Sequence, residues 1–195
     1  MSVFKRVVRF EVSRRQLGLT FLKARTMPTL GISSRCADMW HVLFLDYDNI
    51  KRGLVEDEYL VLQAENALPP GYLFASKEVE EDGELYGNYH VICLVKLPLN
   101  EVVRIQGQTH CDLSYRSLYR DSRFRSWVLR QFPKGGGEKV RFLTILGEPV
   151  NFQWEVSSAH LAYLKELYPE IPDLPYMARD GEEGIFLTHY KAAVK

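Results

Sequence analysis

The sequence predicts an α+β fold, with a central, mostly antiparallel sheet flanked by helices. Two observations support this class. Strand-like and helix-like segments follow one another in an order that suits one sheet covered by helices. The chain of 195 residues, 46% of them hydrophobic, is also long enough for one well-buried domain. We therefore expect a single domain over residues 1–195, without internal repeats or a clear linker.

In the first half of the chain, residues 3–11 alternate between apolar and polar types as a strand does. The expected strands that follow are 41–47, 71–75 and 89–96. Apolar residues recur at helical spacing from Asn49 to about Ala67, and Pro69-Pro70-Gly71 ends that helix. Residues 77–87 are charged and rich in turn formers, which predicts a loop or the tip of a hairpin.

In the second half, Asn100 is expected to cap a helix. Residues 157–168 form an amphipathic helix with Ser157 or Ser158 as its cap, and an irregular tail follows. A flexible loop at 133–138 contains three consecutive glycines. The remaining expected strands are 126–132, 139–146 and 184–190.

Composition excludes several classes of protein. No apolar run approaches the ~20 residues of a membrane-spanning helix, and the charged N-terminal residues do not resemble a signal peptide. A cytoplasmic location is therefore expected. Cys36, Cys93 and Cys111 are odd in number and form no Cys-x-x-Cys pair, which argues against a structural zinc site.

The net charge of zero hides a segregation of charge along the chain. Bases dominate residues 1–25 and 116–141, whereas acids gather between Asp46 and Asp82. An acidic metal site flanked by basic stretches suits a polyanionic substrate, because the bases screen phosphates while the acids hold the metal. Ordinary surface charge is the alternative interpretation.

The segment His41-Val-Leu-Phe-Leu-Asp46-Tyr-Asp48 is an apolar strand that ends in two carboxylates at positions i and i+2. Side chains alternate along a strand, so Asp46 and Asp48 are expected to point the same way. Two nearby acids repel each other unless a cation lies between them, and Mg²⁺ or Mn²⁺ prefers carboxylate oxygens. The alternative is that Asp46-Tyr-Asp48-Asn49 ends the strand and caps the next helix.

Three further segments carry candidate site residues. Gly87-Asn88-Tyr89-His90 leads into an apolar strand, and the missing side chain at Gly87 allows a ligand or another backbone to come close. Taken alone, His90 is more simply a hydrogen-bonded core histidine. Asp112 follows a helix and offers a third acid. Arg130 interrupts an apolar strand, which is costly unless its guanidinium meets an anion.

In this order, the motifs resemble those of the archaeo-eukaryotic primase superfamily over roughly residues 40–146. That superfamily includes small primase subunits, primase-polymerases of plasmids and viruses, and the polymerase domain of bacterial end-joining ligases. Phe44-Leu-Asp46-Tyr-Asp48 matches its first motif and Gly87-Asn88-Tyr89-His90 its second. Asp112 is the best match to the third motif, although Gln108-Thr-His-Cys is not the apolar strand that the family prefers. The zinc-binding element of many primases is missing.

The resemblance implies an RRM-like catalytic core and metal-dependent nucleotidyl transfer, for primer synthesis or extension in DNA replication or repair. Two Mg²⁺ or Mn²⁺ ions would be held by Asp46, Asp48 and Asp112. The residues that would bind the nucleoside triphosphate are His90, Asn88, Arg130 and Lys134. Template phosphates of single-stranded or primed nucleic acid would be bound by Arg116, Arg120, Arg123 and Arg125. The aromatic residues among these arginines, which would stack on bases, are Tyr115, Tyr119, Phe124 and Trp127. A helicase or an accessory replication subunit is an expected partner.

Two other classes of function remain open from the sequence. One is a ferredoxin-like RNA-binding or RNA-processing domain that works without metal, with His41, His90 or His110 as general base. The other is a catalytically inactive replication-initiation module that binds single strands. The choice between dNTP and NTP substrates also stays open.

Overall fold

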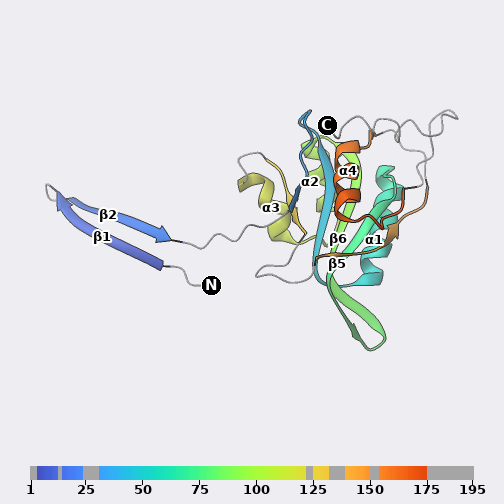
Figure 1. Ribbon diagram of the computed structural model, residues 1–195, viewed down its shortest axis with the longest axis horizontal. Coiled ribbons are helices and arrows are strands. Elements are labelled where there is room, and N and C mark those ends of the chain that lie inside the picture. Colours follow the sequence, from blue (N-terminus) through green and yellow to red (C-terminus); the bar gives the residue numbers. More distant parts are fainter. Residues whose placement is uncertain are drawn as a thin grey trace.

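The computed structural model describes residues 4–12, 15–23, 31–121, 125–131, 139–149 and 154–174. Within these ranges the strands are β1 (Phe4–Val12), β2 (Arg15–Lys23), β3 (Gly31–Ser33), β4 (His41–Lys51), β5 (Gly71–Glu81), β6 (Glu84–Leu97), β7 (Val128–Arg130) and β8 (Arg141–Leu146). The helices are α1 (Arg52–Asn66), α2 (Leu99–Gly107), α3 (Leu113–Asp121) and α4 (Ser158–Leu167). The chain is therefore α+β, as the sequence predicts (Figure 1).

The central sheet has four strands in the order β4-β6-β5-β8, and all neighbouring strands are antiparallel. Helix α1 connects β4 to β5, and β6 lies between these two strands. This split β-α-β arrangement is also the first half of a ferredoxin-like sheet. A ferredoxin-like sheet has its fourth strand beside its first, whereas β8 pairs with β5. The expected RRM-like order is therefore present in three strands and changed in the fourth.

Strands β5 and β6 extend far beyond the short strands expected at 71–75 and 89–96, and form one long hairpin. The turn consists of Asp82 and Gly83, whose φ angles are +52° and +77°. Two central residues with positive φ give a turn that matches the twist of antiparallel strands, and Asp-Gly is a preferred sequence for it. The expected hairpin tip at 77–87 is thus correct in kind but shorter.

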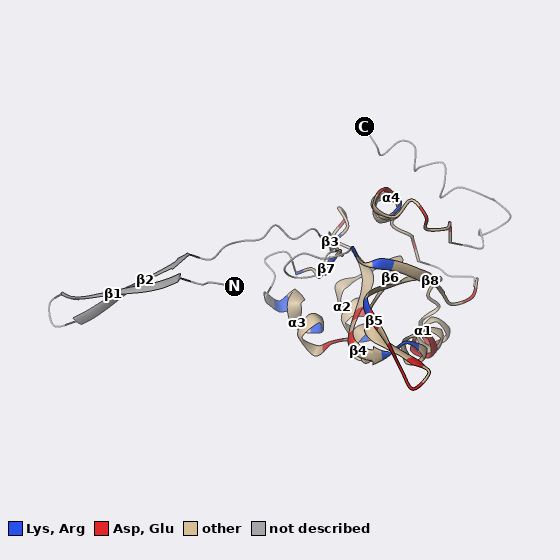
Figure 2. Ribbon diagram, turned by 60° about the horizontal axis from the view of Figure 1, so that its bottom comes forward, with Lys and Arg blue, Asp and Glu red and all other residues tan. Residues whose placement is uncertain are grey.

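Helices cover both faces of the central sheet (Figure 2). Tyr47 of β4 points towards α1, where its hydroxyl donates to Glu58. Helix α2 lies beside α1, and the guanidinium of Arg104 donates to the side-chain oxygen of Asn66. On the opposite face α4 packs on the sheet, because the His160 ring stands edge-on to Phe44. The sheet thus lies between α1 and α2 on one face and α4 on the other.

A smaller antiparallel sheet of β3 and β7 lies next to the start of β4. The Ser34 amide donates to the carbonyl of Trp127, and the Val42 amide donates to the carbonyl of Ser34. Trp127 is fully buried and stands edge-on to His41. This packing joins the segment that carries Arg130 to the strand that carries the acid pair.

Several boundaries differ from the sequence-based expectations. Helix α2 begins at Leu99 with Pro98 at the cap position, so the prediction of Asn100 as the cap is wrong. Helix α3 and strand β2, which pairs with β1 along its whole length, were not expected. The expected strand at 184–190 and the whole loop at 133–138 lie outside the described residues.

Candidate functional site

The two acids of the Asp-x-Asp motif lie near the end of β4, which continues to Lys51. Helix α1 has Lys51 at its cap position, and no side chain caps it. The alternative that the acid pair caps this helix is therefore wrong. The strand is irregular between Tyr47 and Ile50, and Asn49 has a left-handed φ of +51°. Bulges of this kind re-aim side chains and are frequent next to active sites.

A neighbouring strand holds this bulge in place. The side-chain oxygen of Asn88 in β6 accepts a hydrogen bond of 2.8 Å from the Asn49 amide. Gly87 precedes it, and a Cβ there would lie 2.3 Å from the carbonyl oxygen of Lys77 in β5. Of the two expected explanations for Gly87, the close approach of another backbone is therefore correct. Asn88 fixes the backbone next to Asp48.

His90 lies directly opposite Asp46 in the β4–β6 register. Its Nε2 atom is 3.2 Å from Oδ1 of Asp46. The residue is only 8% exposed, and its Nδ1 atom is buried without a hydrogen-bond partner in the part of the chain that the structure describes. A buried polar atom without a partner is costly in a folded protein, which marks this position as one where a ligand can supply the missing contact.

Asp112 comes from a different part of the chain and lies against the same strand. Its amide donates a hydrogen bond of 2.7 Å to the carbonyl of Asp46, and the Asp46 amide donates to Sγ of Cys111 at 3.3 Å. Asp112 also begins α3, because its Oδ2 accepts a 2.6 Å hydrogen bond from the Tyr115 amide. Asp112 thus caps a helix, and its backbone lies against the strand that carries the acid pair.

Electrostatics link the predicted site residues. The pKa of Asp48 is raised above its ordinary value, first because protein atoms displace water from part of its carboxyl and then by the charges of Asp46 and Asp112. His90 and Arg130 act in the opposite direction on the same pKa. Residues from β4, β6, β7 and the start of α3 therefore interact at one place.

The donor set at this place suits a hard divalent cation, because it consists of carboxylates that disfavour one another's charge. In the ranges that the structure describes, no three histidine, cysteine, aspartate or glutamate side chains are already arranged around a common metal position. The contacts explain why, since Asp46 is engaged by His90 and Asp112 by the first turn of α3.

Arg130 is exposed at the end of β7 and faces solvent, so the expectation of a buried guanidinium within an apolar strand is wrong. Basic residues also lie on α3 (Figure 2). The guanidinium of Arg116 is partly buried and approaches the carbonyl of Thr109, whereas that of Arg120 lies over the Tyr119 ring. Arg125 is exposed.

Other predicted contacts are corrected or lie outside the described residues. Tyr115 is 4% exposed and Trp127 is fully buried, so neither ring is available for stacking on bases. Trp127 instead packs in the hydrophobic core. Arg123, Phe124 and Lys134 lie outside the described residues.

Sequence reasoning missed that the buried hydroxyl of Tyr115 is close enough to Asp46 to be affected by its charge. This hydroxyl has no hydrogen-bond partner among the described residues, and its pKa is raised well above the ordinary value by burial and then by the charge of Asp46. The spacing in the sequence could have predicted this proximity, because Tyr115 follows Asp112 by three residues and therefore lies in the first turn of a helix that Asp112 caps.

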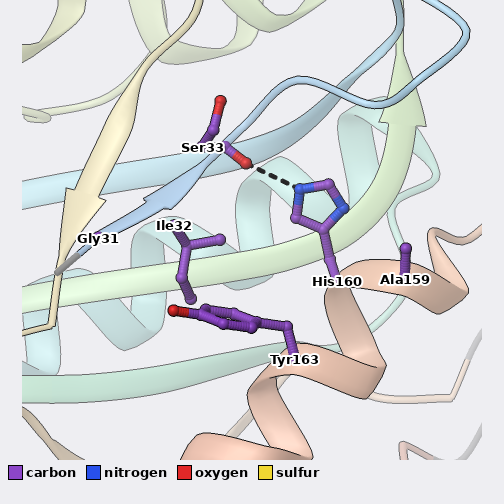
Figure 3. A pocket seen from close by; sticks show the side chains of 6 residues that line it. All are labelled: Gly31, Ile32, Ser33, Ala159, His160 and Tyr163. Atoms are coloured by element: carbon purple, nitrogen blue, oxygen red, sulfur yellow. Dashed lines mark hydrogen bonds between the residues drawn. The ribbon is translucent and has the colours of Figure 1, made fainter. Parts of the chain in front are cut away.

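A pocket of about 390 Å³ lies elsewhere, between β3 and α4 (Figure 3). His160 projects towards it, but Nε2 of its ring donates to the Ser33 carbonyl, and Nδ1 accepts from the Ser157 hydroxyl. Tyr163 and Ile32 supply apolar surface. Because both ring nitrogens of His160 are already bonded, the acid cluster remains the stronger candidate site.

None of the helices in the described ranges has the length and apolar character needed to cross a membrane. Comparison of the chain with models of known protein families, with curated proteins and with solved structures found no match in any of the three.

Proposed function

We propose that this protein is a metal-dependent nucleotidyltransferase of the primase-polymerase type, which synthesises or extends primers on single-stranded template. One observation carries the proposal. Asp46, His90 and Asp112 are far apart in the sequence, yet Nε2 of His90 lies 3.2 Å from Oδ1 of Asp46 and the Asp112 amide donates to the Asp46 carbonyl. This proximity of three residues from the matched motifs supports the proposal.

In the proposed reaction, the primer 3′-hydroxyl oxygen attacks the α-phosphorus of the incoming nucleotide. A new P–O bond forms, the hydroxyl proton passes to water, the bond from the α-phosphorus to the bridging oxygen breaks, and pyrophosphate leaves. Two Mg²⁺ or Mn²⁺ ions, held by Asp46, Asp48 and Asp112, would lower the pKa of the attacking hydroxyl and neutralise the triphosphate. The acids themselves need not exchange protons.

The remaining residues would handle phosphate charge. His90 has one ring nitrogen beside Asp46 and the other without a partner, which suits hydrogen bonding to a phosphate oxygen. Arg130 is exposed, and its charge already acts on the acid cluster, so it can neutralise charge on the leaving pyrophosphate. Lys134 remains a proposed contact of the same kind. Asn88 supports the site through the backbone at Asn49.

The basic residues of α3 and the segment after it would bind the template phosphates, and these are Arg116, Arg120, Arg123 and Arg125. Such contacts do not depend on base sequence, which suits a polymerase. A helicase or accessory subunit as partner, and a cytoplasmic location, stay predictions.

The test is nucleotide incorporation on a single-stranded template, with labelled dNTPs or NTPs, Mn²⁺ or Mg²⁺, and lanes with and without primer. Asp46→Ala is the matched control. Metal-dependent product that vanishes in this variant supports the proposal, and the primer-free lane shows whether the protein initiates synthesis. Tight single-strand binding without product would instead indicate a binding module, and RNA cleavage in EDTA a metal-free nuclease.

A further inference from the structure

The carboxylate of Glu58 in α1 joins three segments of the chain behind the acid site. Its Oε1 accepts a 2.6 Å hydrogen bond from the Tyr47 hydroxyl, and its Oε2 accepts one of 3.0 Å from the His110 amide. Nδ1 of the His110 ring lies against the same Oε2. The Glu58 side chain is only 10% exposed.

Both partners of Glu58 belong to the segments that carry the acids. Tyr47 lies between Asp46 and Asp48, and its side chain points to the opposite face of the sheet, because neighbouring side chains alternate along a strand. His110 lies two residues before Asp112. Glu58 therefore connects the acid pair to the third acid without touching the site itself.

This connection matters because β4 is an edge strand of the central sheet. On its free side, the loop at residues 109–112 takes the place of a neighbouring strand. The Asp112 amide donates to the Asp46 carbonyl, and Sγ of Cys111 accepts from the Asp46 amide. From the loop itself this is one backbone hydrogen bond and one bond to sulfur, a weak acceptor, while Gln106, just before the loop, donates through Nε2 to the Phe44 carbonyl.

We propose that Glu58 is a positioning residue, which holds the loop at 109–112 against β4 and thereby sets the place of Asp112 relative to Asp46 and Asp48. The inference rests on the proposed function for its effect on metal binding. Residues that contact and orient metal ligands without binding the metal themselves typically lower metal affinity or activity by about 10- to 100-fold when they are removed.

The loop has internal contacts that do not depend on Glu58. The Thr109 hydroxyl donates to the carbonyl of Gln106, and the Cys111 amide donates to Oγ1 of Thr109. Loss of Glu58 should therefore leave the loop folded and anchored at Gln106, with a looser hold on the part that carries Asp112. A displaced Asp112 changes the site, whereas the sheet and α1 stay intact.

Two variants separate positioning from general stability. Glu58→Gln can still accept from the His110 amide through its oxygen and donate to the Tyr47 hydroxyl through its nitrogen, so it should keep the loop in place. Glu58→Ala loses both contacts. Glu56→Ala is the matched control, because Glu56 lies on the same helix and pairs only with Arg52 in the ion pairs of the described residues.

The experiment measures Mn²⁺ binding to the full chain by electron paramagnetic resonance, together with hydrogen exchange at the Asp112 amide in metal-free buffer. We expect Glu58→Ala to weaken Mn²⁺ binding about tenfold and to speed that exchange, while Glu58→Gln and Glu56→Ala behave like the wild type. Asp46→Ala shows how much binding belongs to the acid site.

The outcomes are distinguishable. If the wild type binds no Mn²⁺ through Asp46, the proposed function fails, whatever the exchange data show. If the wild type binds Mn²⁺ and Glu58→Ala binds it equally well, with unchanged exchange at Asp112, the positioning role is wrong. A loss in Glu56→Ala as large as that in Glu58→Ala would also overturn it, since the effect would then come from α1 as a whole.

Discussion

His90 and Asp46 face each other across antiparallel strands, with Nε2 of the histidine 3.2 Å from Oδ1 of the aspartate. The other ring nitrogen of His90 is buried without a hydrogen-bond partner among the described residues. A core histidine would ordinarily have both nitrogens satisfied, as His160 does in the same protein. His90 is thus buried and paired, as the simpler interpretation expects of a core histidine, and only its second nitrogen departs from that interpretation.

His90→Ala should raise the apparent KM for nucleotide, with a smaller effect on kcat, because a lost phosphate contact weakens binding in the ground state as well as in the transition state. A loss of one charge-assisted hydrogen bond corresponds to roughly 10-fold in KM. Steady-state incorporation with varied nucleotide measures it. A KM equal to that of the wild type would remove His90 from the nucleotide site.

Asp48→Asn should abolish incorporation and raise the melting temperature in metal-free buffer at neutral pH. The folded protein raises the pKa of Asp48, by burial first and then by Asp46 and Asp112, so its charged form destabilises the fold. This penalty grows as the pH rises from the ordinary pKa through the raised one, and it is absent below the ordinary value.

The difference in melting temperature between Asp48→Asn and the wild type should accordingly vanish in strong acid. Melting curves at several pH values in EDTA test this. A lower melting temperature for Asp48→Asn at neutral pH would mean that Asp48 has a structural role, and it would count against the metal site.

The parts of the site that depend on local periodicity could be predicted from the sequence. Continuous apolar runs before Asp46 and after His90 predict buried strands, and the structure has both, although β4 continues to Lys51 and β6 begins at Glu84. The register in which these two strands pair is a long-range property that no local pattern encodes. The expectation that Asp46 and His90 belong to one site came instead from the order of the motifs along the chain.

The third acid shows where such reasoning ends. Asp112 lies in a loop, and long-range contacts of this loop with Asp46 and Glu58 bring it to the site. Helix α3 was missed because it is short and polar, and both of its leucines, Leu113 and Leu118, are exposed. The place of β8 beside β5 also depends on how the chain crosses the sheet, which no local pattern encodes.

The backbone conformation of Asn49, in the bulge after Asp48, predicts how substitutions at this position change the stability of the protein. A left-handed backbone, here with φ of +51°, is tolerated by asparagine, free of cost for glycine and unfavourable for alanine. Asn49→Ala should lower the free energy of unfolding by about 1 kcal/mol, whereas Asn49→Gly should change it little. Urea unfolding compares the two, and equal losses in both variants would show that the side chain matters more than the backbone.

Arg130→Ala should raise the pKa of Asp48 further, because the positive charge of Arg130 favours the carboxylate. It should also slow incorporation, since the leaving pyrophosphate loses a cation. NMR titration of the Asp48 carboxyl measures the first effect without any substrate. Arg141→Ala is the control, because this exposed arginine pairs with Glu78 instead. An unchanged pKa in Arg130→Ala would place Arg130 outside the site.

The basic residues of α3 and the following segment predict that the affinity for single-stranded nucleic acid falls as the salt concentration rises. Each phosphate contact contributes about −0.7 to the slope of log K against log salt for single-stranded nucleic acid. Arg120→Ala and Arg125→Ala should each reduce the slope by about this amount, equally for all template sequences, because phosphate contacts carry no base information.

Fluorescence anisotropy of a labelled oligonucleotide at several salt concentrations provides this slope. Arg104→Ala is the matched control, because Arg104 is an exposed arginine on α2, where it pairs with Glu101. If Arg104→Ala changed the slope as much as Arg120→Ala, binding would follow overall charge and α3 would have no special role. A slope reduced only by the α3 and Arg125 variants would place the template on the side of the protein that also carries the acids, because α3 begins at Asp112.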